Sequence, residues 1–202
     1  MSKAAMVYVV VVDDAARESL RFLLETSHLA VRAYQSARSF LDVLSAADVG
    51  CVITDVKMPE MDGLELVRQV RRRNPELPVI VITGHADVPL AVDAMKAGAV
   101  DFIEKPYDGE ALLGSVRSAL SVRGSKPPRD GERAEIETRL AVLTQRERQV
   151  LDGLIAGRSN KVIAHDLGIS ARTVEIYRAN VMAKMQATSL SQLVRMALIA
   201  AA

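Results

Sequence analysis

The stretch Cys51-Val52-Ile53-Thr54-Asp55-Val56-Lys57-Met58-Pro59 decides the fold of the N-terminal half. Four apolar or β-branched residues run directly into one carboxylate, Asp55, before Pro59 interrupts the chain. A continuous apolar run bounded by turn signals is typical of a strand buried on both faces of a parallel sheet. Ligands bind just beyond the carboxyl ends of such strands, and Asp55 falls there. Taken alone, Asp55 is better explained as the start of a turn.

Strand-like and helical patterns alternate through the first 121 residues. Apolar runs that predict strands lie at Met6–Val12, Ala30–Tyr34, Cys51–Thr54, Pro78–Thr83 and Ala99–Ile103. Helical patterns follow them over 15–27, 37–46, 63–73, 87–98 and about 108–121. This repeated alternation predicts an α/β domain whose parallel sheet is covered by helices on both faces.

The composition is that of an ordinary globular protein. The 202 residues are 50% hydrophobic and 25% charged, which allows one large domain or two small ones. The single cysteine, Cys51, lies in a predicted strand, so no internal disulfide forms and a catalytic thiol is disfavoured. No apolar run reaches the length that crosses a bilayer, and the N-terminus lacks a signal-peptide pattern. We therefore expect a cytoplasmic protein without a membrane partner.

Charge is distributed unevenly between the two halves. Residues 1–120 contain 13 basic and 17 acidic side chains, whereas residues 121–202 contain 13 basic and 8 acidic ones. The basic excess of the second half indicates an anionic partner, and nucleic acid is the hypothesis it motivates.

Three polar side chains follow consecutive strands of the predicted sheet. Asp55 closes the third strand, Thr83 closes the fourth, and Lys105 follows the fifth. Because the carboxyl ends of parallel strands meet at one edge, these side chains are expected to face one crevice. A carboxylate, a hydroxyl and an ammonium suit covalent phosphoryl transfer, with the carboxylate as nucleophile. A divalent cation that offsets the transition-state charge is then the missing part.

Several motifs of this half resemble the receiver domain of FixJ-like response regulators. They are Thr54-Asp55-Val56-Lys57-Met58-Pro59, Asp62-Gly63, Val81-Ile82-Thr83-Gly84-His85 and Met95-Lys96-Ala97-Gly98-Ala99-Val100-Asp101-Phe102-Ile103-Glu104-Lys105-Pro106. The resemblance covers residues 1–121. It implies an α/β flavodoxin-like fold, a doubly wound sheet of five parallel strands.

The same resemblance implies roles for individual residues. Asp55 would accept a phosphoryl group from a cognate histidine kinase, with Mg²⁺ as the cofactor. Thr83, Phe102 and Lys105 would contact the phosphoryl group or transmit its presence to the surface formed by the fourth helix and fifth strand. Receivers would form a homodimer through that surface. The bond between Lys105 and Pro106 is expected to be cis, which would aim the ammonium inward.

The acidic pair that receivers carry at the end of their first strand is displaced in this sequence. In the family this pair usually precedes an arginine of the first helix by six and five positions. Counting back from Arg17 gives Val11 and Val12, whereas the nearest acidic residues are Asp13 and Asp14.

Two arrangements are open. In the first, strand one is longer by two residues, and Asp13 and Asp14 still reach the pocket. A shift of two keeps every side chain on its face of the sheet. Mg²⁺ would then be bound by Asp13, Asp14, Asp55 and the backbone carbonyl of Lys57.

In the second arrangement, Val11 and Val12 occupy the pocket and Asp14 caps the first helix. Lys105 is then free to pair directly with Asp55. The count from Arg17 favours this arrangement, in which metal-dependent phosphorylation of Asp55 is weak or absent.

A linker and a small helical domain follow the receiver-like half. Residues 122–138 are predicted to be a linker that is partly helical, because Gly124–Gly131 is rich in turn formers and charge. Thr144-Gln145-Arg146-Glu147 is a capping box that begins a helix. A further turn at Gly168-Ile169, followed by the cap residue Ser170, predicts a helix-turn-helix within a domain over 139–202.

The last helix of this motif, which runs to about Met185, is the candidate recognition helix. Its apolar residues Val174, Ile176, Val181 and Met185 are expected to serve the core. Its N-terminal residues are expected to face base edges in a major groove. Arginines there either read guanine or bind phosphate.

The second half resembles the LuxR-type DNA-binding domain over about 140–200. The resemblance is carried by Leu143–Leu151, Ser159-Asn160-Lys161, Ser170–Glu175 and Arg178–Met185. It implies a final helix over 190–200 that forms a dimer contact on DNA, although its apolar side chains also suit a plain core. The candidate DNA-binding residues are Asn160, Lys161, Arg172, Thr173, Glu175, Tyr177, Arg178 and Lys184.

The sequence therefore predicts a two-component response regulator that is not an enzyme and that regulates transcription by binding double-stranded DNA. RNA polymerase is a further candidate partner. One alternative is a DNA-binding regulator with a degenerate receiver, controlled independently of phosphorylation. An aspartyl-phosphate enzyme is less favoured, because no additional general acid lies near Asp55 in the sequence.

Overall fold

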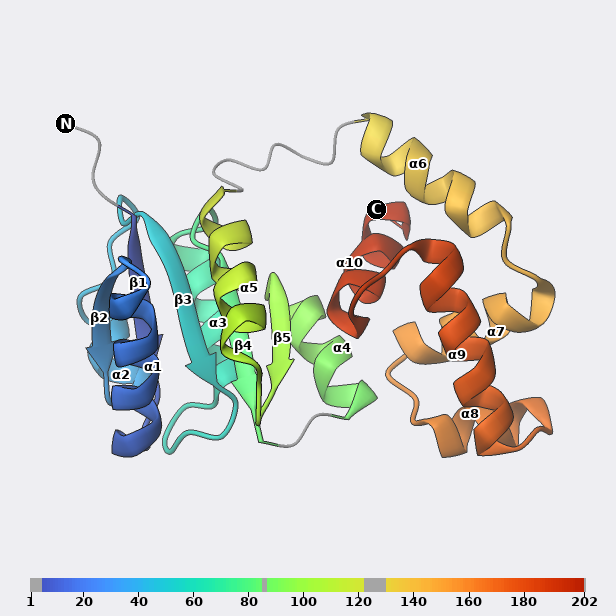
Figure 1. Cartoon of the computed structure of the whole chain (residues 1–202), viewed down its shortest axis with the longest axis horizontal. Helices are drawn as coiled ribbons and strands as arrows, with labels where there is room; N and C mark the ends of the chain where they lie inside the picture. The colour runs from blue at the N-terminus through green and yellow to red at the C-terminus, as the bar shows by residue number, and fades with distance from the viewer. Residues whose placement is uncertain (1–4, 85–86, 122–129, 202) are drawn as a thin grey trace. The chain divides into compact units, whose positions relative to one another are not determined.

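The computed structural model describes residues 5–84, 87–121 and 130–201 (Figure 1). His85 of the third receiver motif and most of the predicted linker lie outside these residues. The chain forms two compact units, one built around a sheet and one of helices alone, and each is described by itself.

The sheet of the first unit contains five parallel strands. They are β1 (Met6–Val10), β2 (Ala30–Tyr34), β3 (Gly50–Asp55), β4 (Val79–Thr83) and β5 (Asp101–Glu104). Their spatial order is β2-β1-β3-β4-β5, and each neighbouring pair is parallel. This is the flavodoxin-like order, so the predicted fold class of the first half is confirmed.

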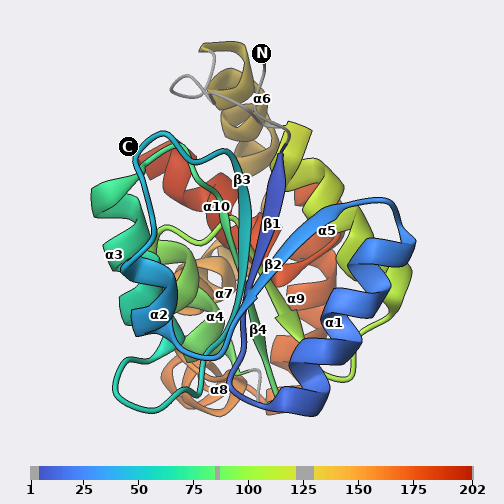
Figure 2. The same ribbon diagram turned by 90° about the vertical axis from the view of Figure 1, so that its left-hand side faces the viewer.

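Helices cover both faces of the sheet (Figure 2). The helices α1 (Asp14–Thr26) and α5 (Gly109–Ser121) lie on one face, and α2 (Ala37–Leu41) and α3 (Gly63–Arg73) lie on the other. The helix α4 (Val88–Ala97) connects β4 to β5.

The face covered by α1 and α5 has an apolar core that follows the pleat of the strands. Successive side chains of a strand point to opposite faces, so alternate residues share one core. The core on this face contains the buried side chains Val7, Val9, Val11, Leu20, Leu24, Cys51, Ile53, Ile80, Ile82, Leu112 and Val116. Burial raises the pKa of the Cys51 thiol to about 12, so this cysteine is an inert core residue.

The helix α2 is shorter than the predicted 37–46, because it ends at Leu41. The chain that follows it is held by a tertiary contact. The buried amide of Asn74 donates hydrogen bonds to the backbone carbonyls of Ser45 and Asp48, at 3.2 and 3.0 Å. A distant side chain thus anchors the segment that follows α2 through two carbonyl groups at and beyond the end of the predicted helix.

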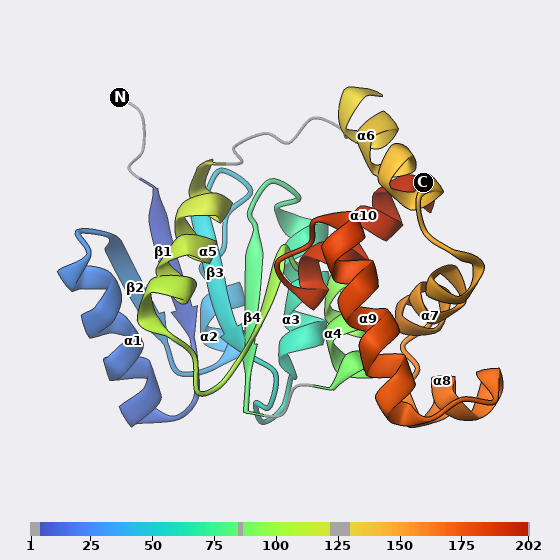
Figure 3. The ribbon, with the colours of Figure 1, turned by 45° about the vertical axis from the view of Figure 1, so that its right-hand side comes forward.

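The second unit takes in residues 87–95, which include most of α4, and five further helices (Figure 3). They are α6 (Asp130–Ala141), α7 (Gln145–Ile155), α8 (Asn160–Leu167), α9 (Ala171–Met185) and α10 (Leu190–Ala201). The predicted capping box is present, because Thr144 and Glu147 each bond to the other's backbone N–H. Gly168 ends α8 with a φ of 65°, a conformation that suits glycine, and Ser170 caps α9. The turn between α8 and α9 is therefore a helix-turn-helix connection.

The core of the helical unit contains buried side chains from each of the helices α6 to α10. Its buried members include Ile136, Leu140, Val150, Leu151, Leu154, Ile163, Val174, Val181, Met185 and Leu193. Ile136 and Leu140 belong to α6, so this helix packs as part of the unit and contributes to its stability. No helix among residues 5–84, 87–121 and 130–201 is long and apolar enough to cross a membrane.

Candidate functional site

The carboxylate of Asp55 is paired with the ammonium of Lys105 at the carboxyl edge of the sheet. The Lys105 Nζ lies 2.5 Å from Asp55 Oδ2, and the two side chains are 26% and 17% exposed, respectively. The backbone positions both residues, because the Lys105 amide donates to the carbonyl of Thr83 at 2.7 Å and extends the pairing of β5. The peptide bond between Lys105 and Pro106 is cis. The Lys57 amide also donates to Asp55 Oδ1 at 3.3 Å.

The pKa of the Tyr107 phenol is raised by burial and by the nearby charge of Asp55. Tyr107 therefore stays a neutral phenol around physiological pH, and it packs against the apolar core between the sheet and the helices α1 and α5.

Val11 occupies the position beside Asp55 that an acidic residue would need. The strands β1 and β3 pair Val10 with Thr54, so the next step of the register brings Val11 opposite Asp55. Both residues share their face of the sheet with the apolar core between α1 and α5. Val11 is 0% exposed, and its amide donates to the carbonyl of Tyr34 at 3.2 Å.

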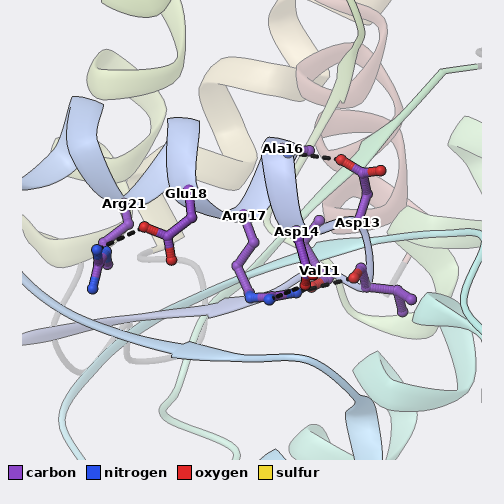
Figure 4. Close-up of polar contacts among 8 residues, drawn as sticks. Val11, Asp13, Asp14, Ala16, Arg17, Glu18 and Arg21 are labelled. Atoms are coloured by element: carbon purple, nitrogen blue, oxygen red, sulfur yellow. Dashed lines mark hydrogen bonds and ion pairs between the residues drawn. The ribbon is translucent and has the colours of Figure 1, made fainter.

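The carboxylates of Asp13 and Asp14 are used by the first turn of α1 (Figure 4). Asp13 is the N-cap, and its Oδ1 accepts from the Ala16 amide at 2.7 Å. The expectation that Asp14 caps this helix is wrong, because α1 begins at Asp14 itself. The Asp14 side chain is 87% exposed and pairs with Arg17. One position decides the difference, since only the residue just before the helix has the extended backbone of a cap.

Arg17 fixes the turn between β1 and α1. Its Nη1 donates to the backbone carbonyls of Val11 and Val12 at 2.8 and 3.0 Å, while its Nη2 holds Asp14 (Figure 4). The side chain of Arg17 is only 14% exposed. These bonds fix the backbone of Val11 and Val12 at the end of β1. This is the second of the two arrangements predicted from the sequence, in which the valines lie where receivers have their acidic pair.

The residues at this edge do not fit a Mg²⁺ site. Magnesium takes oxygen ligands in octahedral geometry, including one or two carboxylates. Here the Asp55 carboxylate is already paired with the Lys105 ammonium, and the buried isopropyl group of Val11 occupies the neighbouring position. In the described parts of the chain, no three acidic, histidine or cysteine side chains gather where they could hold a metal.

Thr83 and Phe102 lie on the neighbouring strands. Thr83 ends β4 and is 1% exposed, and Phe102 is half-buried on β5, paired with Val81. Because successive side chains of a strand alternate between the two faces, the side chains of Thr83 and Phe102 leave the backbone on the face opposite to that of Asp55 and Lys105. The structure thus brings Asp55 and Lys105 into contact and places Thr83 at the same edge of the sheet.

The candidate DNA-binding residues divide into two groups. The first group consists of Lys161, Arg172 and Glu175, which are exposed, and Arg178, which is partly exposed at the edge of the core side of α9. Among the described residues, neither Lys161, Arg172 nor Arg178 forms an ion pair with an acidic side chain. Their positive charges are therefore available to an anionic ligand.

The second group of candidates lies at a helix cap, in the core or in buried positions of the unit. Thr173 Oγ1 lies 2.8 Å from Ser170 Oγ at the cap of α9, and Tyr177 packs against the helical core. The Asn160 Oδ1 is buried and has no hydrogen-bond partner in the described part of the chain.

Lys184, the last of these candidates, is held by Glu147. Its Nζ lies 2.7 Å from Glu147 Oε2 and 3.4 Å from the carbonyl oxygen of Val142. The Glu147 side chain is only 5% exposed. The hydrogen bond from Lys184, followed by that from the Thr144 backbone, holds the pKa of Glu147 below its ordinary value. Lys184 thus joins α9 to the capping box of α7.

Ile176 corrects the predicted core of α9. Val174, Val181 and Met185 are buried as expected, but Ile176 is 56% exposed. At 3.6 residues per turn, two positions are separated by about 200°, so Ile176 points away from Val174. The helical spacing of the three buried residues was the signal that would have found this. Ile176 adds an apolar side chain to the outward face of α9.

Comparison with known proteins agrees with both halves of the structure. Residues 9–117 match the response regulator receiver domain, and residues 141–197 match the luxR family of bacterial regulatory proteins. The transcriptional regulatory protein FixJ of Azorhizobium caulinodans is 54% identical over 200 residues, covering 99% of this chain and 95% of the relative. The chain is a FixJ-like response regulator.

The likeness of this response regulator to FixJ proteins extends over both domains. FixJ of Bradyrhizobium diazoefficiens is 48% identical over 200 residues, covering 98% of the regulator and 97% of the relative. The crystal structure of full-length FixJ from B. japonicum, with 46% identity and a TM-score of 0.57, covers 99% of the regulator and 98% of that chain. The regulator thus has a receiver followed by a LuxR-type DNA-binding domain, and it acts in transcriptional regulation.

Proposed function

We propose that the regulator binds duplex DNA through the outward face of α9, as a homodimer, and that its receiver governs this binding. The observation that carries the proposal is the sidedness of α9. Val174, Val181 and Met185 face the core, whereas Arg172 and Ile176 face outward. A helix that follows a helix-turn-helix connection and exposes such a face fits the major groove.

The residues of this face suit two kinds of contact with DNA. The guanidinium group of Arg172 suits phosphate oxygens or guanine, and the exposed ammonium of Lys161 on α8 suits phosphate. Arg178, four positions after the buried Val174, lies away from Ile176 at the edge of the core side, and its partly exposed guanidinium suits phosphate rather than a base edge. The Ile176 side chain suits the 5-methyl group of thymine, which is the apolar feature of the major groove. Glu175 suits the amino group of cytosine.

The proposed partners of the receiver follow from the relatives. A cognate histidine kinase would act at Asp55, receivers would pair through the surface of α4 and β5, and the helix α10 would add a dimer contact on DNA. RNA polymerase is the further proposed partner of the DNA-bound dimer. Val11 beside Asp55 favours a second candidate, a DNA-binding regulator whose receiver is not switched by metal-dependent phosphorylation.

Replacing Arg178 with alanine is expected to weaken binding of the full chain to a labelled duplex of mixed sequence. Loss of one phosphate contact removes one released counterion, so the slope of log K against log salt should fall by about 1. The measurement is fluorescence anisotropy over a series of salt concentrations. Arg117→Ala, on α5 of the receiver, is the matched control and should leave the isotherms unchanged. Identical isotherms for Arg178→Ala and wild type would refute this contact.

Replacing Ile176 with alanine is expected to remove a preference for thymine over uracil. Duplexes are first selected from a random pool by the full-length regulator and then synthesised with uracil in place of thymine. Wild type should bind the uracil duplex several-fold more weakly, because each lost methyl contact removes buried apolar surface. The Ile176→Ala variant should bind both duplexes alike. A wild type that does not distinguish them would exclude this role for Ile176.

A further inference from the structure

We propose that the receiver of this regulator works without Mg²⁺, because Lys105 alone balances the charge of Asp55 and two valines stand where metal-binding carboxylates would have to be. The proposal deepens the function proposed above and rests on it. It concerns the chemistry at Asp55, whereas DNA binding concerns α9.

The first support is the position of Val11. The register places it opposite Asp55, on the same face of the sheet, with its side chain fully buried in the apolar core. An isopropyl group offers no oxygen to a metal ion and excludes water from the space beside the carboxylate. A Mg²⁺ ion, which keeps several of its water ligands, would meet an apolar side chain in place of a second carboxylate on this side of Asp55.

The second support is the commitment of the nearest alternative ligands. Asp13 Oδ1 is bonded to the backbone of α1, and Asp14 is exposed and paired with Arg17. The carbonyl oxygens of Val11 and Val12 accept hydrogen bonds from the Arg17 guanidinium (Figure 4). A metal ion at this turn would have to displace a cation that already uses two backbone oxygens and one carboxylate.

The third support is the charge balance. The Asp55 carboxylate and the Lys105 ammonium, 2.5 Å apart, sum to zero. Carboxylates at positions 11 and 12 would add two negative charges, which a divalent cation would neutralise. With valines at both positions, this negative charge is absent, and no divalent cation is needed to neutralise it. At the site as it is, Mg²⁺ would share one carboxylate with the Lys105 ammonium, and the two cations would repel each other at short range.

The expected consequence is that a small phosphodonor labels Asp55 poorly, with or without Mg²⁺. In that reaction a carboxylate oxygen of Asp55 attacks the phosphorus of acetyl phosphate, the bond from phosphorus to the acetyl oxygen breaks, and acetate leaves with the electron pair. The charge that develops on the phosphoryl oxygens has Lys105 as its stabilising cation in place of a metal.

The test is a titration of the full-length regulator with MgCl₂. At each MgCl₂ concentration, NMR measures the amide chemical shifts of the segment around Asp55. The wild type should show no saturable shift, and acid-labile labelling by acetyl phosphate should be low and independent of Mg²⁺. Val11→Asp combined with Val12→Asp should bind Mg²⁺ saturably and gain Mg²⁺-dependent labelling. Adding Asp55→Asn to this pair should abolish both gains.

Saturable Mg²⁺ binding by the wild type that disappears in Asp55→Asn would overturn the proposal. So would a folded Val11→Asp, Val12→Asp variant that binds no Mg²⁺, since the valines would then not be the cause. If burial of Asp at position 11 prevents folding, the wild-type titration and its Asp55→Asn control still decide. Neither result depends on the DNA titrations of Arg178→Ala, so the two proposals fail separately.

Discussion

Alanine at position 63 is expected to lower the free energy of unfolding of the receiver unit by more than about 3 kcal/mol, above the usual range for overpacking. Gly63 is the first residue of α3, and its amide donates to the Val56 carbonyl at 2.9 Å. A Cβ atom there would lie 2.1 Å from the Asp55 carbonyl oxygen and 3.0 Å from the Val56 Cα. Both neighbours are backbone, so no side-chain rotation relieves the clash.

The backbone that would have to move is held on both sides. The strand β3 is paired with β1 and β4, so displacing its end breaks sheet hydrogen bonds and moves Asp55 away from Lys105. Urea unfolding followed by circular dichroism measures the effect. Gly114→Ala, inside α5, is the control: nothing lies within 4 Å of the position that its methyl group would take, and the helix should gain about 1 kcal/mol. Equal midpoints for Gly63→Ala and wild type would disprove the close approach.

Replacing Lys184 with methionine is expected to destabilise the helical unit, with any loss of DNA binding as a consequence of lost stability. Methionine keeps the apolar stem of the side chain but leaves the Glu147 carboxylate, 5% exposed, without its ammonium. A buried charge that loses its partner is more costly than a pair that is replaced as a whole. The thermal midpoint of the unit should fall by several degrees.

A double variant distinguishes this role from a contact with phosphate. Adding Glu147→Gln to Lys184→Met removes the stranded charge and should restore much of the lost thermal stability, together with DNA binding. Lys161→Met is the matched control, because its exposed ammonium should affect DNA binding but not the melting temperature. If Lys184→Met melts like the wild type yet binds DNA poorly, Lys184 is a phosphate contact after all.

Local patterns predicted those parts of the receiver in which neighbouring residues decide the structure. The strand that ends at Asp55 and the helix over 63–73 follow from apolar periodicity and a cap residue, which act within a few positions. The length of α2 did not follow, because the segment after Leu41 is anchored by Asn74, far along the chain, through the carbonyls of Ser45 and Asp48. Tertiary hydrogen bonds of this kind leave no mark in the sequence around 37–46.

The helical unit shows the same division at the level of single residues. The capping box at Thr144 and the turn at Gly168 were readable, since each depends on residues three or fewer positions apart. Lys184 was a DNA-binding candidate by resemblance, but its partner Glu147 lies 37 positions away. Only the folded unit shows that this ammonium already has a carboxylate.

The sequence by itself determined that the chain contains a parallel sheet with Asp55 at its carboxyl edge, followed by a basic helix-turn-helix. Apolar periodicity and turn chemistry are local and therefore legible. The tertiary structure alone decided between valines and aspartates at the edge of the sheet. Which of them lies there depends on the register of β1 against β3 and on the hydrogen bonds from Arg17 to the carbonyls of Val11 and Val12. The register exists only once distant segments have paired.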